Sequence, residues 1–235
     1  MATSAVNAVG VLGGTFDPIH NGHLRLGWEA QSHLQLSQLR LVPCHLPTHR
    51  EHPRSSAQHR LTMTQLACEN VPGFQVDDWE IRRDQPSYSV HTLAHLREQL
   101  NDDTALVFIL GMDSFNQFSS WHQWEKILEL AHLGLAQRPG AELPAPETIE
   151  GRLLAQRKVP AAQLLQKKAG NISLFDTTAL DISATQLRRQ MAQGISPRFL
   201  LPDSVRAYIE HHELYRDDLN QDNSSLYRNA DTTND

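Results

Sequence analysis

The sequence has no apolar run long enough to cross a membrane, and its body contains no low-complexity block or internal repeat. A membrane-spanning helix needs about 18 apolar residues, so we expect no membrane partner. No Lys or Arg precedes the short apolar stretch at residues 8–12, and a signal peptide would begin with such positive charge. That stretch is therefore expected to start a folded strand.

Cysteine and positive charge are also scarce. The two cysteines, Cys44 and Cys68, have neither metal-binding nor redox spacing, and free thiols suit a reducing cytoplasm. We therefore expect a cytoplasmic location. The formal net charge of −6 argues against general binding to nucleic acid. A polyanionic substrate would need a local group of positive side chains.

Short apolar runs alternate with amphipathic segments along most of the 235 residues. This alternation predicts an α/β fold: a Rossmann-like, mostly parallel sheet with helices on both faces. The sequence predicts one domain over residues 1–215 and a polar, disordered tail over 216–235. The expected strands cover residues 8–12, 39–43, 74–81, 105–110, 133–137 and 171–175. The expected helices cover residues 23–36, 56–69, 90–100, 184–193 and 202–213, and residues 141–170 are read as helical or irregular cover.

The segment GGTFDPIHNGH at residues 13–23 follows the first strand directly. Its glycine pair allows a tight turn, and Asn21 is expected to cap the helix that follows. A strand, a glycine turn and a helix N-terminus favour phosphate binding, because N–H groups and the helix dipole face the anion. His20 and His23 can then point toward one bound group. Neither the Walker motif nor GxGxxG is present, and a capped turn with two solvated histidines is the alternative.

The loop at residues 44–54 supplies local positive charge, with three His and two Arg in eleven residues. A solvated basic loop is one alternative reading. A zinc site formed by His45, His49 and His52 is another, but prolines interrupt the regular spacing that such a site favours. We predict no protein metal site.

Three further segments follow predicted strands. Residues 85–89 (QPSYS) lead into a helix, residues 111–113 (GMD) end the most apolar strand, and residues 181–188 (DISATQLR) open another helix. Ser183 is expected to form a capping box with Gln186. Each segment alone also fits ordinary helix capping. Together they predict one cleft, because ligands bind at the carboxyl ends of parallel strands.

These motifs resemble the nucleotidyltransferase superfamily with the (His/Thr)-x-Gly-His signature, and within it bacterial nicotinate mononucleotide adenylyltransferases. The resemblance implies transfer of AMP from ATP to nicotinate mononucleotide, giving nicotinate adenine dinucleotide and pyrophosphate for NAD biosynthesis. It implies in-line attack without a covalent enzyme intermediate, with Mg²⁺ carried by ATP. The sequence leaves a homo-oligomer open. Alternatives are the same reaction on nicotinamide mononucleotide, another superfamily member such as phosphopantetheine adenylyltransferase, or a non-catalytic nucleotide-sensing module.

The resemblance also implies roles for individual residues. The expected catalytic residues are His20, His23 and Arg188. The expected ATP-binding residues are Gly13, Gly14, Thr15, Phe16, Ser183, Thr185 and Arg188. The expected acceptor-binding residues are Tyr88, Ser89, Asp113, Trp121, His49, Arg50 and Arg138. Trp121 would stack on the pyridine ring, whereas Trp124 is assigned to the core, and Thr48 replaces the second proline of the family's PPH-[KR] loop.

Overall fold

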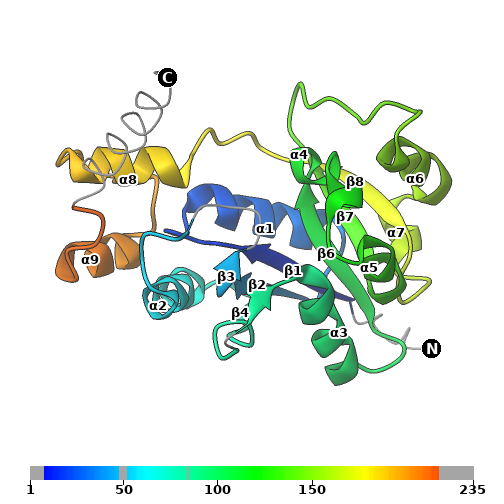
Figure 1. The fold of residues 1–235 in the computed structure, drawn as a ribbon, viewed down its shortest axis with the longest axis horizontal. Helices are drawn as coiled ribbons and strands as arrows, with labels where there is room; N and C mark the ends of the chain where they lie inside the picture. Colours follow the sequence, from blue (N-terminus) through cyan, green and yellow to red (C-terminus); the bar gives the residue numbers. More distant parts are fainter. Residues whose placement is uncertain (1–7, 48–51, 84, 217–235) are drawn as a thin grey trace, which may run out of the picture.

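The computed structural model describes residues 8–47, 52–83 and 85–216 (Figure 1). Within these ranges, six parallel strands form the main sheet in the order β4-β2-β1-β6-β7-β8. They are β1 (Ala8–Gly14), β2 (Gln38–Pro43), β4 (Phe74–Val76), β6 (Ala105–Gly111), β7 (His132–Gln137) and β8 (Ile172–Asp176). A short parallel pair, β3 (Leu46–Pro47) with β5 (Pro86–Ser87), lies outside this sheet. The parallel sheet confirms the predicted fold class.

Both faces of the sheet are buried, as the continuous apolar runs require. In β6, Ala105, Val107 and Ile109 belong to the core on one face, whereas Leu106 and Phe108 belong to the core on the other. This period-two alternation within an all-apolar strand places the strand in the middle of the molecule.

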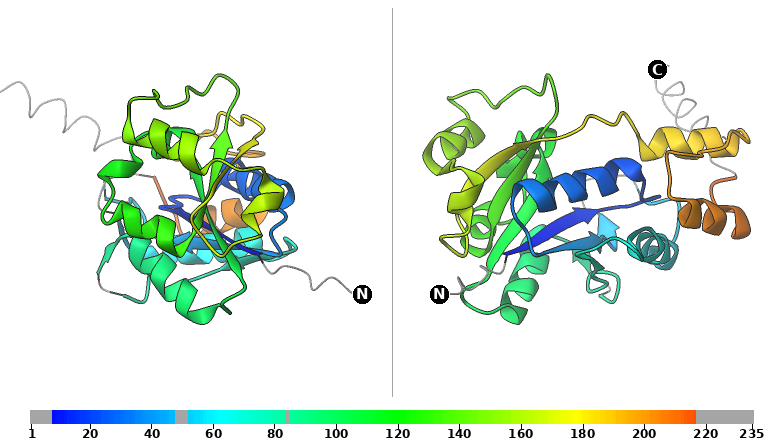
Figure 2. Two further views of the ribbon diagram at one scale, coloured as in Figure 1. Left: turned by 90° about the vertical axis from the view of Figure 1, so that its right-hand side faces the viewer. Right: turned by 180° about the vertical axis from the view of Figure 1, so that it is seen from behind.

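Helices cover both faces, as Figures 1 and 2 show. One core contains residues of α1 (Asn21–His33), α2 (Ala57–Cys68), α7 (Ala161–Leu164), α8 (Ala184–Ala192) and α9 (Asp203–His211). The other contains residues of α3 (Ser89–Gln99), α4 (Met112–Phe115), α5 (Trp124–Leu130), α6 (Ile149–Arg157) and a 3₁₀ turn at Phe118–Ser120. None of the helices in the described ranges is long and apolar enough to span a membrane.

The order in which the chain adds strands to the sheet reverses between β1 and β6. From β1 the chain moves outward to β2 and β4, and then returns to build β6, β7 and β8 on the opposite side of β1. In open parallel sheets ligands bind at such a switch point, beyond the carboxyl ends of the strands. Gly14 and Gly111 end the two strands at this point.

One predicted helix start and one predicted strand end differ from the structure because polar groups decide them. The cap of α1 is His20, not Asn21, whose amide instead donates to the Phe199 carbonyl (2.8 Å). The strand from Phe74 ends at Val76, since the Asp77 carboxylate accepts the Trp79 N–H (3.0 Å) and turns the chain.

The helix that opens at residues 181–188 starts and ends where predicted. Its N-terminus, however, is not stabilised by the expected side-chain hydrogen bond. Ser183 is the cap of α8, yet its side chain makes no capping hydrogen bond, so the predicted capping box is wrong. Gly194 follows the helix with φ +74°, the left-handed conformation that glycine adopts without strain. Residues 217–235, most of the predicted tail, lie outside the described residues.

Candidate active site

The turn after β1 is shaped by the close approach of Gly14 to Phe16. A Cβ on Gly14 would lie 2.6 Å from the Phe16 ring, so a side chain there is excluded. Neither Gly13 nor Gly14 has a positive φ, whereas Phe16 does (φ 49°) and is buried. The prediction that the glycine pair is needed for an unusual backbone conformation is therefore wrong. Gly14 is needed for space, because the Phe16 ring folds back over it.

His20 and His23 lie against each other at the N-terminus of α1. Their ring centroids are 3.7 Å apart and the ring planes differ by 24°. The backbone N–H of His20 donates to His23 Nδ1 (3.3 Å). Nδ1 therefore accepts, and a neutral His23 ring carries its proton on Nε2, where it can donate to an anion. A Cβ on Gly22 would lie 3.0 Å from His20 Nδ1, so glycine between the histidines gives this ring room.

The surroundings of His20 keep its ring neutral. The side chain is buried, and Nδ1 has no hydrogen-bond partner among the described residues. Burial, followed by the positive charge of Arg138, lowers the pKa of His20 to about 4. Arg138 directly follows β7 and is exposed. It lies at the same edge of the parallel sheet as the turn after β1.

The start of α8 reaches the same place. A Cβ on Gly22 would lie 3.7 Å from Cβ of Ile182. Arg188 donates from Nη1 to the backbone carbonyl of Asp17 (2.8 Å) and from Nη2 to Thr185 Oγ1 (3.4 Å). The predicted ATP residues of α8 and of the first turn are therefore neighbours in space.

The segment between β8 and α8 runs along α1, as Figure 2 shows. The buried carboxylate of Glu29 accepts from the Thr178 N–H (2.9 Å) and hydroxyl (2.6 Å), and from Arg25 Nε (2.7 Å). These contacts lower the pKa of Glu29 although burial opposes them. A charged Glu29 thus holds this segment on the helix that carries the histidines.

A buried arginine ties the first turn to the loop after β2. Arg60 donates from Nη1 to the carbonyls of Thr15 (2.8 Å) and Cys44 (2.5 Å), and from Nη2 to that of His45 (3.1 Å). The sequence placed Arg60 in an amphipathic helix and gave it no role. One cation within such a helix carries no signal that separates it from a solvated side chain.

Asp17 forms a second tie. Its buried carboxylate accepts from the Arg54 N–H (2.6 Å), the Ser55 hydroxyl (2.5 Å) and the Tyr215 hydroxyl (2.7 Å). Burial and the Asp17 charge raise the pKa of Tyr215 well above its usual value, so the phenol stays a donor. Sequence reasoning treated Asp17 as a turn residue only. Tyr215, an aromatic residue directly before a polar tail, was the one feature of the sequence that could have indicated a buried contact at this end of the fold.

The proposed acceptor turn is tied to the loop after β2. Tyr88 is the cap of α3 and Ser89 its first residue; the first N–H groups of a helix have no intrahelical partner. Strand β3 pairs with β5, and the His45 N–H donates to Ser87 Oγ (2.9 Å).

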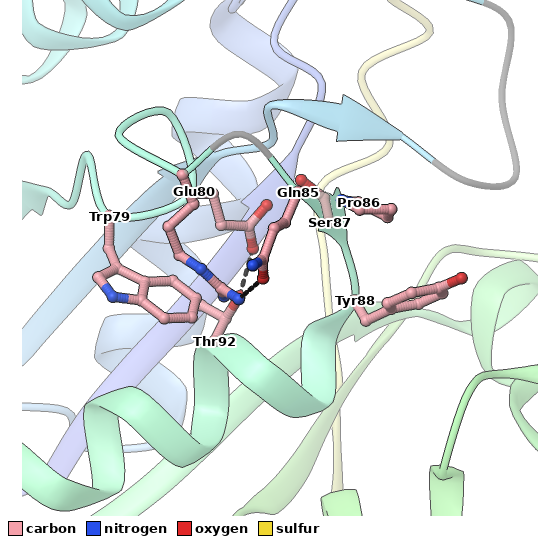
Figure 3. A pocket seen from close by; sticks show the side chains of 8 residues that line it. Trp79, Glu80, Gln85, Pro86, Ser87, Tyr88 and Thr92 are labelled. Carbon is pink, nitrogen blue, oxygen red and sulfur yellow. Dashed lines mark hydrogen bonds between the residues drawn. The ribbon is translucent and has the colours of Figure 1, made fainter.

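The carboxyl group of Glu80 lies behind the acceptor turn. Figure 3 shows Glu80 close to Gln85 and Thr92, with Tyr88 pointing away from them. The Thr92 hydroxyl donates to Glu80 Oε1. Burial raises the pKa of Glu80, although Ser87 and Thr92 act in the opposite direction. Sequence reasoning gave Glu80 no role, because a Glu in a segment that also contains Asp78 and Arg82 resembles any exposed side chain.

The aromatic side chains after β6 divide between core and site. Phe115 and Phe118 are buried, as expected for two of the four. Trp121 and Trp124 are both half-buried. Trp121 lies edge-on to Phe108, with ring centroids 6.1 Å apart. Stacking of Trp121 on a substrate ring stays a prediction.

The remaining predicted site residues are placed less closely. Asp113 is exposed in the first turn of α4, beyond the carboxyl end of β6. His49 and Arg50 lie outside the described residues. Across the described ranges, no three His, Cys, Asp or Glu side chains are placed to hold a metal ion.

The fold and the residues gathered at this edge of the sheet are those of a class of nucleotidyltransferases. A family model described as cytidylyltransferase-like matches residues 11–190, and the chain belongs to this family. It is 46% identical over 212 residues to a probable nicotinate-nucleotide adenylyltransferase of Pseudomonas entomophila, covering 90% of this chain and 96% of that one. It is also 46% identical over 208 residues to a protein of the same description from Cellvibrio japonicus, covering 88% and 98%.

Solved structures show the same fold at low sequence identity. The nicotinic acid mononucleotide adenylyltransferase of Plasmodium falciparum, in complex with NaAD, superposes with a TM-score of 0.65 at 16% identity. The superposition covers 89% of this chain and 98% of that one. A putative nicotinate-nucleotide adenylyltransferase from Vibrio parahaemolyticus gives 0.57 at 13% identity, covering 86% and 99%.

Proposed function

We propose that this chain transfers AMP from ATP to nicotinate mononucleotide, giving nicotinate adenine dinucleotide and pyrophosphate in NAD biosynthesis. The names and coverage of the relatives support this activity. The main observation in its support is that residues 13–23, Arg138 and Arg188, which are far apart in sequence, lie at the switch point of the sheet. The first turn, the histidine pair and Arg188 lie around one helix N-terminus, and Arg138 acts on His20.

The reaction requires placement and charge stabilisation more than proton transfer. The attacking group is a phosphate oxygen of the acceptor, largely dianionic at pH 7 because its second pKa is about 6. It can attack the α-phosphorus of ATP in line and expel pyrophosphate without a general base. Holding the reactants in line can supply about 7–11 kcal/mol of the barrier, and positive groups stabilise the charge of the transition state.

The site residues divide this work by position. His23 would donate from Nε2 to a phosphate oxygen, because its Nδ1 already accepts the His20 N–H. His20 would stay neutral above about pH 5 and hold the orientation of His23 through ring stacking. Arg188, with Ser183 and Thr185, would bind the departing pyrophosphate. The backbone N–H groups of the first turn would complete the cradle.

Mg²⁺ belongs with the substrate in this proposal. It would arrive as MgATP, coordinated mainly by phosphate oxygens and water. The acceptor's pyridine ring would lie near Trp121, and its carboxylate at the N–H groups of Tyr88 and Ser89. The two free thiols, Cys44 and Cys68, suit the proposed cytoplasmic location.

One assay tests the activity: purified full-length protein with MgATP and each acceptor, measured by pyrophosphate release. We expect kcat/KM for nicotinate mononucleotide to exceed that for nicotinamide mononucleotide by about tenfold or more, since backbone donors favour a carboxylate over an amide. Release only with phosphopantetheine would assign another member of the superfamily. No release with any acceptor, together with retained ATP binding, would indicate a nucleotide sensor.

A further inference from the structure

Basic side chains surround Tyr88 at the proposed acceptor turn. The ring of His122 lies 4.4 Å from the Tyr88 ring and 5.9 Å from the ring of His91, which is 5.7 Å from Tyr88. The positive charges of Arg83 and Lys126 also act on the His91 ring. On a chain with net charge −6, this cluster is a local exception.

The cluster is assembled from three elements. His91 is in the first turn of α3 and donates its N–H to the Tyr88 carbonyl (2.9 Å). His122 directly follows Trp121, the residue proposed to stack on the pyridine ring, and its Nε2 lies 3.1 Å from Gln123 Nε2. Arg83 comes from the turn before β5, where its guanidinium lies 4.0 Å above the Trp79 ring. The histidines thus flank the turn at which an acceptor carboxylate would bind.

The charges that act on His91 are all positive. Burial, then Arg83, His122 and Lys126, lower the pKa of His91. The carboxyl group behind the turn, Glu80, accepts from Thr92, and burial raises its pKa. An anion placed beside the His91 ring would offset this positive charge and favour protonation of that ring. A neutral amide would not.

We propose that His91, with His122 beside it, determines acceptor specificity: protonation of His91 favours an acceptor that carries a carboxylate over one that carries an amide. The inference rests on the proposed function and deepens it. Both acceptors share the 5′-phosphate, so its titration cancels in a ratio of the two. The carboxylate itself stays ionised, because carboxylic acids titrate near pH 4. The preference for the nicotinate form therefore rises as pH falls.

The experiment measures kcat/KM for nicotinate mononucleotide and for nicotinamide mononucleotide between about pH 5.5 and pH 8, with saturating MgATP and constant ionic strength. In the unmodified chain the ratio of the two values should rise by about threefold to tenfold toward low pH. In the double variant His91→Gln, His122→Gln it should change by less than about twofold. Each single variant should lie between these results.

His211→Gln is the matched control, because His211 is an exposed histidine on α9 whose ring contact is with His212. It should keep the full pH dependence of the ratio. A second measurement needs no variant: raising the salt concentration should reduce the ratio at about pH 6 more than at pH 8, because salt screens the added charge.

A flat ratio in the unmodified chain would overturn the inference, and so would a pH-dependent ratio that survives in a folded double variant. If the double variant does not fold, the salt measurement on the unmodified chain decides. The inference is then overturned if salt reduces the ratio of the two kcat/KM values equally at both pH values. Failure of the proposed function looks different, since neither acceptor would then release pyrophosphate at any pH.

Discussion

At the scale of single residues, the site depends on which atoms are already engaged. The Nδ1 of His23 accepts the His20 backbone N–H, so a neutral ring carries its proton on Nε2. His20 is buried against it and has a lowered pKa. The two histidines of the motif therefore have unequal tasks, although the sequence presents them as equivalent.

Replacement of His23 tests this division. We expect His23→Ala to lower kcat by about 10²–10³-fold, because it removes a donor to a phosphate whose charge grows in the transition state. The KM for nicotinate mononucleotide should barely change, since the acceptor ring is proposed to bind near Tyr88 and Trp121. Steady-state kinetics with each substrate varied in turn measures both quantities. A rise in KM with kcat unchanged would mean that His23 only binds substrate.

At the scale of elements, the strands were predictable because apolar side chains fill them, whereas several of their ends were not. β1 and β6 are recognisable from composition alone. The start of α1 at His20 and the turn at Asp77 depend on polar groups that neighbouring residues also offer, so the sequence does not select among them. The strand order is likewise absent from any local pattern.

In the site, too, the location of the motifs was predictable, whereas the side chains that fix its loops were not. Its motifs follow predicted strands, and a parallel sheet places the ends of such strands at one edge. The side chains that fix the loops, including Arg60, Glu80 and Tyr215, are single polar groups in otherwise ordinary segments. Their partners lie far away in sequence, and only the folded chain reveals them.

Arg60 provides the test at this scale. Arg60→Met should lower the free energy of unfolding by about 3–5 kcal/mol, because three carbonyls lose a buried cationic donor. Any protein that folds should also show raised KM values for both substrates, since the first turn and the loop after β2 lose their common anchor. Urea denaturation followed by circular dichroism measures the stability.

Arg206→Met is the control for this substitution. Arg206 pairs with Asp203 and Glu210 on the surface of α9, and its loss should change stability little. Equal effects of the two substitutions would contradict the anchoring role of Arg60.

At the scale of the whole molecule, the buried neutral histidine links stability to pH. The pKa of His20 is about 4 in the folded chain and near 6.5 in the unfolded chain. Between these values the unfolded chain binds the extra proton, so the free energy of unfolding falls as pH decreases. Above pH 6.5 this titration costs almost no stability, whereas at pH 4 it has removed about 3 kcal/mol from the free energy of unfolding.

Comparison of the unmodified chain with His20→Gln isolates this contribution. Urea unfolding at about pH 7.5 and pH 4.5 should show a greater loss of stability in the unmodified chain, because glutamine does not titrate. The remaining histidines and carboxyl groups affect both proteins alike. Identical pH dependence in the two would mean that His20 titrates normally in the folded state.

The hydrogen bond between the Tyr215 hydroxyl and Asp17 spans 198 positions of the chain. During synthesis the ribosome releases the first turn and its histidines long before Tyr215 emerges. A nascent polypeptide can thus assemble β1 and α1 early, but the buried carboxylate beside them lacks its phenol donor until translation has passed position 215. The buried hydrogen bonds around the first turn are therefore completed late in the synthesis of each molecule, once Tyr215 becomes available.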